Sequence, residues 1–297
     1  MAKNEKRKSG KSRKSALSQA EIDEIVNKDL LNAEQYEQIN KPISLYFDPR
    51  FLGGDNIPKD RGVLFVSNHS VWALADTVVV LAAYKESGRP VRSLGDRNHF
   101  KNPVMGPILE KLGMVIGDPA VCSALMKDGQ NVIVFPGGQR EVFKKRKEVG
   151  DIVWKERVGF IRPALEHDYE IVPVGVVGGD ETYDILADSS DYLRTPLGKW
   201  LDEKGVFDKY LRGKDELPPL VKGVGLLGMP KPARVYVTFG APIRVSEIAR
   251  SGDSKDEMLE TRKIVEQAVK NAIELGVKAR AEDPEQEGFL RRFWQTV

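Results

Sequence analysis

Short apolar runs alternate with segments of helical periodicity along most of this chain. An apolar run of about four to eight residues between turn signals is typical of a buried strand, whereas apolar residues at i, i+3 and i+4 are typical of a helix that packs on one face. This alternation predicts an α/β fold with a mixed, largely parallel central sheet flanked by helices. The expected strands cover residues 62–67, 91–94, 114–116, 131–135, 170–177 and 234–239, and the expected helices cover residues 70–85, 104–112, 120–127, 158–167 and 255–280.

The pattern also suggests where the main domain begins and where it is interrupted. Ser18 and Glu21 have the spacing of a capping box, so we expect an N-terminal helix over residues 18–40. Residues 188–228 are rich in charged residues, Pro and Gly and have no clear period. We expect this segment to be an insertion that lies over one face of the sheet. The α/β domain as a whole is expected to cover residues 18–283.

The N-terminal tail, residues 1–17, changes how the charge of the chain is understood. The chain has a formal net charge of +2, yet residues 1–15 hold seven basic side chains and one acidic one. The remainder, with 39 basic and 43 acidic residues, is acidic, which argues against a broad nucleic-acid-binding surface. The tail has no apolar periodicity and is expected to be disordered. Its Lys and Arg residues predict attachment to an anionic membrane surface, with a merely solvated tail or nucleic-acid attachment as alternatives.

The C-terminal segment, residues 284–297, combines aromatic and basic residues. On a helix, Phe289, Phe293 and Trp294 would share one face, with two arginines beside it. This composition suits a helix that lies in a membrane interface. The alternative is that these aromatic side chains pack back onto the domain.

The composition excludes several other classes of protein. A single cysteine, Cys122, excludes an intramolecular disulfide framework and fits a reducing compartment. With three histidines besides, of which His99 and His167 are expected to be structural, the chain has too few ligands for a His/Cys-rich metal site, and no metal is expected. No apolar run approaches the ~20 residues of a membrane span, and no apolar region follows the basic N-terminus as in a secretory signal. We therefore expect a cytoplasmic protein that associates peripherally with membranes.

The first candidate site follows the expected strand over residues 62–67. Asn68 and His69 come directly after it, and Asp76 lies further along. Ligand sites gather at the carboxyl ends of strands in α/β sheets, and a histidine there can act as a general base that a carboxylate orients. The alternative is a structural histidine at the start of a helix, with Asp76 simply solvated.

Two glycine-containing segments follow later strands. In the first, Gly137 and Gly138 precede Arg140 and Glu141. Paired glycines let backbone N–H groups approach a ligand, and a neighbouring arginine can bind phosphate or carboxylate. The second runs from Val172 through Gly179 and, taken alone, indicates a core strand that enters a glycine turn. The first segment alone is also compatible with an ordinary glycine-rich turn.

In this order, the motifs resemble those of the glycerolipid acyltransferase superfamily, which includes lysophospholipid acyltransferases. The resemblance covers roughly residues 40–280. Its segments are Asn68-His69 with Asp76, the stretch from Pro103 to Ile116, the block Phe135-Pro136-Gly137-Gly138-Gln139-Arg140, the strand Val172-Pro173-Val174, and the terminal strand and turn from Arg234 to Ile243.

Two departures from the common family pattern point to the diacylglycerol-acyltransferase-like branch. Six residues separate His69 from Asp76 instead of four, and Gly137 stands where the common block has Glu. Positions seven apart on a continuous helix lie about 10 Å apart along its axis. Direct pairing of His69 with Asp76 therefore requires His69 on a loop and a chain that turns back before Asp76.

The resemblance implies transfer of a fatty acyl group from a thioester, either acyl-CoA or acyl carrier protein, to a hydroxyl of a lipid acceptor. His69 would be the general base and Asp76 would orient it. Substrate binding would involve Asn68, the backbone of Gly137 and Gly138, and the side chains of Arg140 and Glu141. No cofactor is implied beyond the acyl donor. The alternatives are a non-catalytic lipid-binding protein on the same fold and a lipid hydrolase that uses Ser70 or another serine, although no Gly-x-Ser-x-Gly elbow is present.

Overall fold

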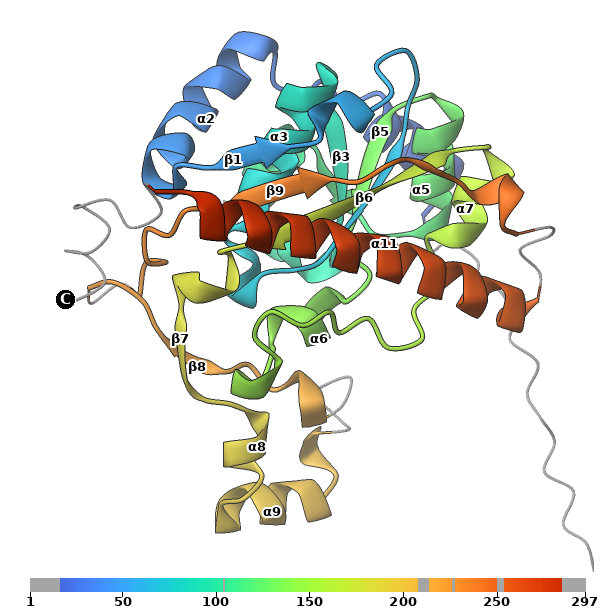
Figure 1. Ribbon diagram of the computed structural model, residues 1–297. Coiled ribbons are helices and arrows are strands. Elements are labelled where there is room, and N and C mark those ends of the chain that lie inside the picture. The colour runs from blue at the N-terminus through green and yellow to red at the C-terminus, as the bar shows by residue number, and fades with distance from the viewer. Residues whose placement is uncertain (1–16, 104, 208–213, 226–227, 250–253, 285–297) are drawn as a thin grey trace, which may run out of the picture.

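The computed structural model describes residues 17–103, 105–207, 214–225, 228–249 and 254–284, which fold around one eight-stranded sheet (Figure 1). Its strands are β1 (Arg50–Leu52), β2 (Leu64–Ser67), β3 (Val91–Gly95), β4 (Met114–Ile116), β5 (Asn131–Val134), β6 (Glu170–Val177), β9 (Tyr236–Phe239) and β10 (Ile243–Arg244). They follow the spatial order β1-β9-β6-β2-β5-β3-β4, and β10 pairs with β6.

Most neighbouring strands run parallel. β2 is parallel to both β5 and β6, β3 to both β4 and β5, and β1 to β9. Only β9 and β10 run antiparallel to β6 among the described strands of this sheet. The prediction of a mixed, largely parallel sheet is confirmed. Because β2, β5 and β6 run parallel, their carboxyl ends meet at one edge, which is where both candidate motifs lie.

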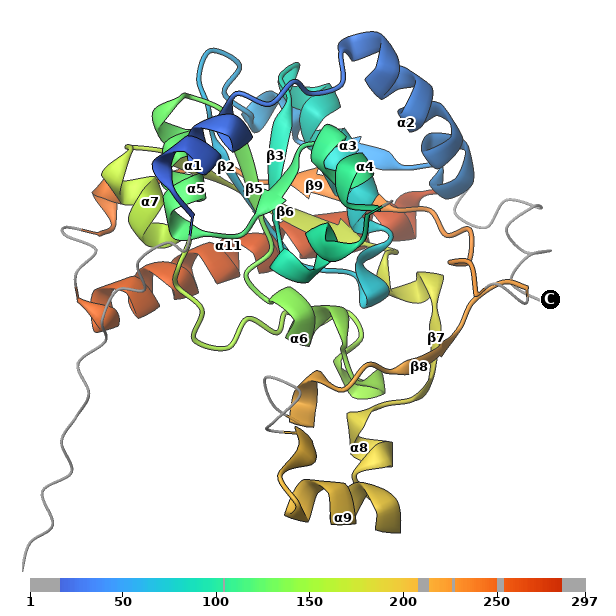
Figure 2. The same ribbon diagram turned by 180° about the vertical axis from the view of Figure 1, so that it is seen from behind.

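Helices cover both faces of the sheet (Figures 1 and 2). Successive residues of a strand point to opposite faces, so Leu64 and Val66 of β2 enter one core layer and Phe65 enters the other. The first layer is closed by α1 (Gln19–Val26), α5 (Pro119–Lys127), α7 (Ile161–Glu166) and α11 (Lys255–Glu282). The second is closed by α2 (Ala33–Phe47) and α3 (Asp76–Ser87). Two further helices are α4 (Met105–Lys111) and α6 (Gly138–Val142). Cys122 is buried in α5.

The prediction of one helix over residues 18–40 is wrong, because the structure has α1 and α2 there. The expected capping box is present at the start of α1. Beyond it, Arg92 Nη2 donates to the backbone oxygens of Val26 and Lys28, at 2.9 and 3.1 Å, and so satisfies carbonyls where α1 ends. The side chain of Asn32 accepts a backbone N–H at 2.9 Å and caps the separate helix α2.

The segment expected to lie over one face of the sheet instead forms a protruding lobe. It holds β7 (Asp184–Ala187), α8 (Ser189–Tyr192), α9 (Pro196–Glu203) and β8 (Leu220–Lys222). The lobe extends away from the sheet past α6 (Figures 1 and 2). Its root is the antiparallel pair β7 and β8, which buries Ile185 against Val71 and Tyr183 in a small cluster of its own. That this segment is an insertion stays a prediction.

The folded domain begins one residue before its expected start at Ser18. Leu17 was counted with the tail, but its side chain packs against the core layer of α1. The predictions for residues 1–16 and 285–297 lie outside the described residues. Within the described part of the chain, none of the helices has the length and hydropathy needed to cross a bilayer.

Candidate active site

His69 lies on a loop at the carboxyl end of β2, and the chain turns back before Asp76. The expected helix over residues 70–85 begins only at Asp76, because a short 3-10 turn, Val71–Ala73, comes first. Trp72 and Ala73 have φ of 60° and 57°, in the left-handed region that bulky residues rarely adopt. This turn lets Asp76 return to the imidazole, so that Nδ1 of His69 lies 2.5 Å from Oδ2 of Asp76. The geometric requirement for direct pairing is met.

The carboxylate of Asp76 determines which imidazole nitrogen carries hydrogen. Its Oδ1 accepts from the backbone N–H of Ser70 at 2.9 Å and from Ser70 Oγ at 2.6 Å, and its Oδ2 faces His69. An ionised carboxylate only accepts, so we assign the hydrogen to Nδ1, which leaves the lone pair of Nε2 available. The ring of Phe135 stacks on the imidazole with a centroid separation of 4.5 Å. His69 therefore has the orientation of a general base.

Ser70 supports this carboxylate rather than acting as a nucleophile. The residue is buried, and its hydroxyl donates to Asp76. Among the described contacts, no hydrogen bond joins Ser70 Oγ to the imidazole of His69. A serine nucleophile needs a base within hydrogen-bond reach, so this geometry does not favour the hydrolase alternative.

Asn68 joins two strands. Its Nδ2 donates to the carbonyl oxygen of Val176 at 3.1 Å, and its Oδ1 accepts from the N–H of the same residue at 2.9 Å. Both ends of the amide are therefore engaged by β6. The structure shows Asn68 fixing the end of β2 beside His69, and the expected contact with substrate stays a prediction.

The glycine-rich loop leads from β5 into α6 and encloses the carboxyl group of Glu141. A side-chain Cβ at Gly137 would lie 2.0 Å from Oε2 of Glu141, so only glycine fits there. Glu141 is fully buried, and its carboxylate accepts from the N–H of His69 at 3.2 Å and from the N–H of Val153 at 3.1 Å. Burial raises the pKa of Glu141, while the charge of Lys144 opposes that shift. Glu141 thus holds the backbone of the His69 loop.

Arg140 and Arg157 hold the same loop from other sides. Arg140 Nη2 lies 2.6 and 2.8 Å from the two carboxylate oxygens of Glu148, and the Arg140 side chain is only 5% exposed. Arg157 Nη1 donates to the carbonyl oxygens of Pro136 and Gly137, at 3.2 and 2.5 Å. The structure therefore places Arg140 in the loop as expected but pairs its guanidinium with a carboxylate. Its predicted role as a phosphate ligand stays a prediction.

A buried ion pair missing from the sequence analysis completes the site. The ammonium of Lys144 is fully buried and donates to the carbonyl oxygen of His69 at 2.9 Å and to Asp180 Oδ2 at 2.8 Å. Asp180 also accepts from the N–H groups of Val71 and Gly150, at 2.9 and 2.8 Å. The pair therefore joins three loops around His69. Asp180 follows two glycines at the carboxyl end of β6, a position that could have drawn attention to it.

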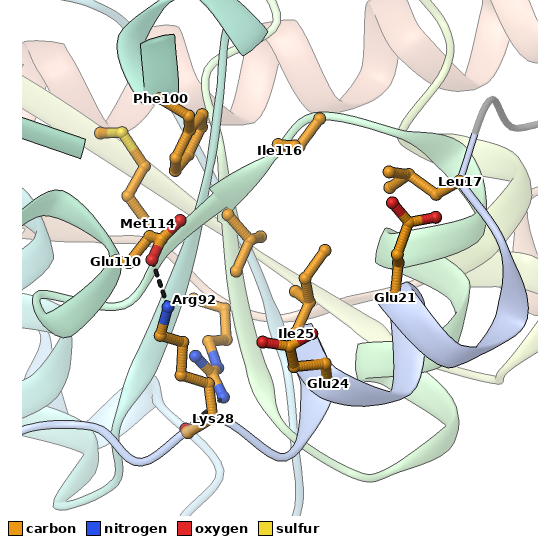
Figure 3. Close-up of a pocket in the computed structure, with 11 residues that line it drawn as sticks. Leu17, Glu21, Glu24, Ile25, Lys28, Arg92, Phe100, Glu110, Met114 and Ile116 are labelled. Atoms are coloured by element: carbon orange, nitrogen blue, oxygen red, sulfur yellow. Dashed lines mark hydrogen bonds and ion pairs between the residues drawn. The ribbon is translucent and has the colours of Figure 1, made fainter. Parts of the chain in front are cut away.

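A cavity of about 210 Å³ lies elsewhere, between α1 and the edge strand β4 (Figure 3). Ile25 of α1 and Met114 of β4 contribute to its apolar lining, and Lys28 bonds Glu110 at its rim. None of the site residues expected from the sequence lines this cavity. The candidate chemistry therefore lies at the carboxyl edge of the sheet and not in this cavity.

Comparisons with known proteins agree with the position of this site. Residues 49–177 match the family model described as Acyltransferase. Phytyl ester synthase 2 of Arabidopsis thaliana, a chloroplastic protein, is 28% identical over 81% of this chain and 36% of its own length. The human protein described as "DGAT1/2-independent enzyme synthesizing storage lipids" is 26% identical over 51% of this chain and 45% of its own. The chain therefore spans less than half the length of these two relatives.

The crystal structure of the lysophosphatidate acyltransferase PlsC from Thermotoga maritima aligns with 86% of this chain and 87% of its own. It has a TM-score of 0.46 and 17% sequence identity. The matched region, residues 49–177, contains His69, Asp76 and the whole glycine-rich loop. The match of this region to the Acyltransferase model and the similarity to the two relatives confirm the resemblance to the glycerolipid acyltransferase superfamily seen in the sequence.

Proposed function

We propose that this protein transfers a fatty acyl group from a thioester to the hydroxyl of a lipid acceptor, with His69 as general base. The observation that carries the proposal is the 2.5 Å contact between His69 Nδ1 and Asp76 Oδ2, which leaves Nε2 free to accept a proton. The family match over residues 49–177 supports the reaction class.

In the proposed reaction, Nε2 of His69 takes the proton of the acceptor hydroxyl while its oxygen attacks the thioester carbonyl carbon. The carbon–sulfur bond of the resulting tetrahedral species breaks, an ester forms, and the thiolate leaves with the electron pair of that bond. The imidazolium returns its proton to the thiolate. Asp76 keeps the imidazole oriented and stabilises its charged form. Because the acceptor oxygen attacks the thioester directly, no covalent enzyme intermediate is needed.

The acyl donor in this proposal is acyl-CoA or acyl carrier protein, and no further cofactor takes part. The printed names of the relatives, a phytyl ester synthase and an enzyme of storage-lipid synthesis, support a lipid acceptor. We assign Gly137 and Gly138 to the substrate-binding loop, because they follow β5 at the edge where His69 lies.

The central test compares purified His69→Ala with His99→Ala, a matched control at an exposed histidine outside the site. With labelled acyl-CoA and a lipid alcohol, His69→Ala should lose about 10²–10⁴-fold in kcat, whereas His99→Ala should retain wild-type activity. Folding of both is checked by circular dichroism. A folded His69→Ala protein with full transferase activity would refute the mechanism. Release of free fatty acid alone would indicate a hydrolase, and binding without turnover a lipid-binding protein.

We also propose that the protein works at a membrane surface, in the cytoplasm, and that the basic residues of the N-terminal tail hold it there. Support comes from the seven basic side chains in residues 1–15 and from the lipid nature of the proposed acceptor. Co-sedimentation with anionic vesicles tests this. A protein that lacks residues 1–15 should bind these vesicles more weakly, and unchanged binding would remove the tail from the proposal.

A further inference from the structure

The lobe formed by β7, α8, α9 and β8 presents large apolar side chains to solvent. Leu197 is 64% exposed and Trp200 is 53% exposed, and both belong to α9 at the outer end of the lobe (Figure 1). Nearer its root, Leu186 of β7 and Leu220 of β8 are also more than half exposed. Large apolar side chains gathered on one exposed element mark interaction surfaces with proteins or membranes.

The apolar residues of α9 lie on a different face from the one that packs on the lobe. Gly198 is buried, and a Cβ there would lie 2.0 Å from the carbonyl oxygen of Tyr192, so this side of the helix faces the lobe. Leu197, Trp200 and Lys204 are spaced three and four residues apart and therefore share another face. All three are exposed, so this face combines two large apolar side chains with a cation.

The acidic residues of α9 are kept off this face. Asp202 accepts from Lys214 Nζ at 3.0 Å, within the lobe. Glu203 stands four residues after Lys199 on the flank of the helix, where the two charges offset each other. Leucine and tryptophan beside a lysine are typical of a helix that lies at the boundary between lipid headgroups and acyl chains, because the lysine stem can extend to the headgroups.

The root of the lobe is joined to the loops around His69. Val71, two residues after His69, packs with Ile185 of β7 in one buried cluster. Arg157, which donates to the carbonyl oxygens of the glycine-rich loop, also lies 3.5 Å from the buried Glu216 of the lobe. A surface that binds α9 therefore also orients the edge of the sheet that carries the candidate site.

That edge exposes the same kinds of side chain as α9. On the loop after β2, Trp72 is 40% exposed and Leu74 is 49% exposed. Lys147, in the 3-10 turn after α6, is exposed as well. Its neighbour Arg146 is exposed but pairs with Asp191 of the lobe at 2.5 Å, which links this turn to α8. Apolar and basic side chains thus occur together both at the outer end of the lobe and at the active-site edge.

We infer that the lobe docks on the surface of a lipid bilayer, with Leu197 and Trp200 of α9 at the boundary between headgroups and acyl chains, and that this docking turns the edge carrying His69 toward the lipid. A bilayer fits these two regions better than a folded partner, because both combine apolar side chains with a cation and a bilayer offers hydrocarbon below an anionic surface. The inference rests on the proposed function, which places the acyl acceptor in the lipid, and it names a docking surface besides the N-terminal tail.

The experiment measures co-sedimentation of the full-length protein with vesicles of phosphatidylcholine and phosphatidylglycerol. The double variant Leu197→Ala with Trp200→Ala removes the apolar side chains and changes no charge, so its partition onto vesicles should fall by about tenfold or more. Leu45→Ala is the matched control, since Leu45 is 87% exposed on α2, away from the lobe, and it should bind as the wild type does. Circular dichroism checks folding. Unchanged binding of the folded double variant would overturn the inference.

Gel filtration without lipid tests whether α9 instead joins two copies of the chain. A wild-type dimer that the double variant dissociates, with vesicle binding unchanged, would overturn docking on lipid.

A second variant tests the orientation of the active-site edge. Lys147→Gln should weaken binding to these anionic vesicles by about fivefold and leave binding to pure phosphatidylcholine unchanged, because only the attraction between charges is lost. Lys41→Gln, at an exposed lysine of α2, is the matched control and should bind as the wild type does. Unchanged binding of Lys147→Gln would overturn the orientation of this edge toward the lipid.

Activity separates this inference from the proposed function. The double variant should lose transfer to a lipid alcohol held in vesicles in proportion to its lost binding, and it should keep the wild-type kcat for a short-chain alcohol dissolved in water. An equal loss with the dissolved alcohol would show that these side chains do not act through docking. A wild-type protein that binds vesicles through α9 but transfers no acyl group to any acceptor would refute the proposed function and leave the docking surface established.

Discussion

The ammonium of Lys144 lies 2.9 Å from the backbone carbonyl oxygen of His69 and 2.8 Å from the carboxylate of Asp180. The same carboxylate holds the N–H groups of Val71 and Gly150. On the other side of the loop, Glu141 holds the N–H of His69. Both backbone polar groups of His69 are thus bound by the buried side chains of Lys144 and Glu141, which restrains the loop on which the imidazole sits.

Lys144→Met should therefore impair both activity and stability. Methionine fills similar space but leaves Asp180 as a buried charge without its ammonium partner, which costs about 3–5 kcal/mol in the free energy of unfolding. The His69 carbonyl also loses its donor, and a small displacement of a catalytic group can reduce kcat by about 10²-fold. Urea unfolding and steady-state kinetics measure the two effects.

The double variant Lys144→Met with Asp180→Asn separates charge from position. Removing both charges should recover part of the lost stability, because no unpaired charge is left buried. The activity should stay low, since the donor to the His69 carbonyl is still missing. If the double variant recovered activity as fully as stability, Lys144 would have a structural role only.

Asp76→Asn should lower kcat by about 10²–10⁴-fold while the protein stays folded. Asp76 accepts three hydrogen bonds, from His69 Nδ1, Ser70 N and Ser70 Oγ. An amide has one oxygen, so in either orientation its NH₂ group faces a donor. The imidazole then loses its orienting acceptor or its preferred tautomer. The pH dependence of kcat and a thermal melt distinguish this loss from unfolding, and a variant with wild-type kcat would contradict the role of Asp76.

The central strands could be predicted because both of their faces are buried, which gives short, continuous apolar runs such as the one that ends at Ser67. The edge strand β1 was missed, since Arg50–Leu52 is only three half-buried residues long. The sequence also did not reveal the break in the expected helix before Asp76. It depends on left-handed backbone at Trp72 and Ala73, which no local preference of these residues favours and which tertiary contacts impose.

The candidate site likewise contains residues that the sequence pattern reveals and residues that it does not. His69 and Asp76 could be found because they stand in a recognisable order after a strand. Lys144 could not be found in this way, because it begins a run of four consecutive basic residues, 144–147, which is typical of a solvated surface. Only its burial separates it from Lys147, which is exposed. The pairing of Arg140 with Glu148 likewise depends on how the chain folds back after α6.

Gly137→Ala should reduce stability and activity together. The added methyl group would lie 2.0 Å from Oε2 of Glu141 and 2.4 Å from its Cβ, so the carboxylate that holds the His69 N–H must move. Overpacking of this kind costs about 1–3 kcal/mol in the free energy of unfolding. Gly159→Ala is the matched control, since a Cβ there meets no atom within 4 Å. Chemical denaturation and kcat measure both variants, and an active, fully stable Gly137→Ala protein would contradict the role of Glu141.

Glu148 should give the protein an acid-sensitive component of stability. Burial raises the pKa of its carboxyl, but bonds from Arg140 and from the N–H of Lys145 outweigh burial and hold the pKa below the ordinary 4.5. A carboxyl whose pKa is lowered by folding stabilises the native state above its unfolded-state pKa, and that contribution is lost as the pH falls through the folded-state pKa. The wild-type free energy of unfolding should therefore decrease more steeply below pH 4.5 than that of Glu148→Gln. Urea unfolding across this range measures the difference, the Glu247→Gln protein, changed at an exposed glutamate of another loop, should follow the wild type, and parallel curves for Glu148→Gln and wild type would show that the pair with Arg140 contributes nothing to folding.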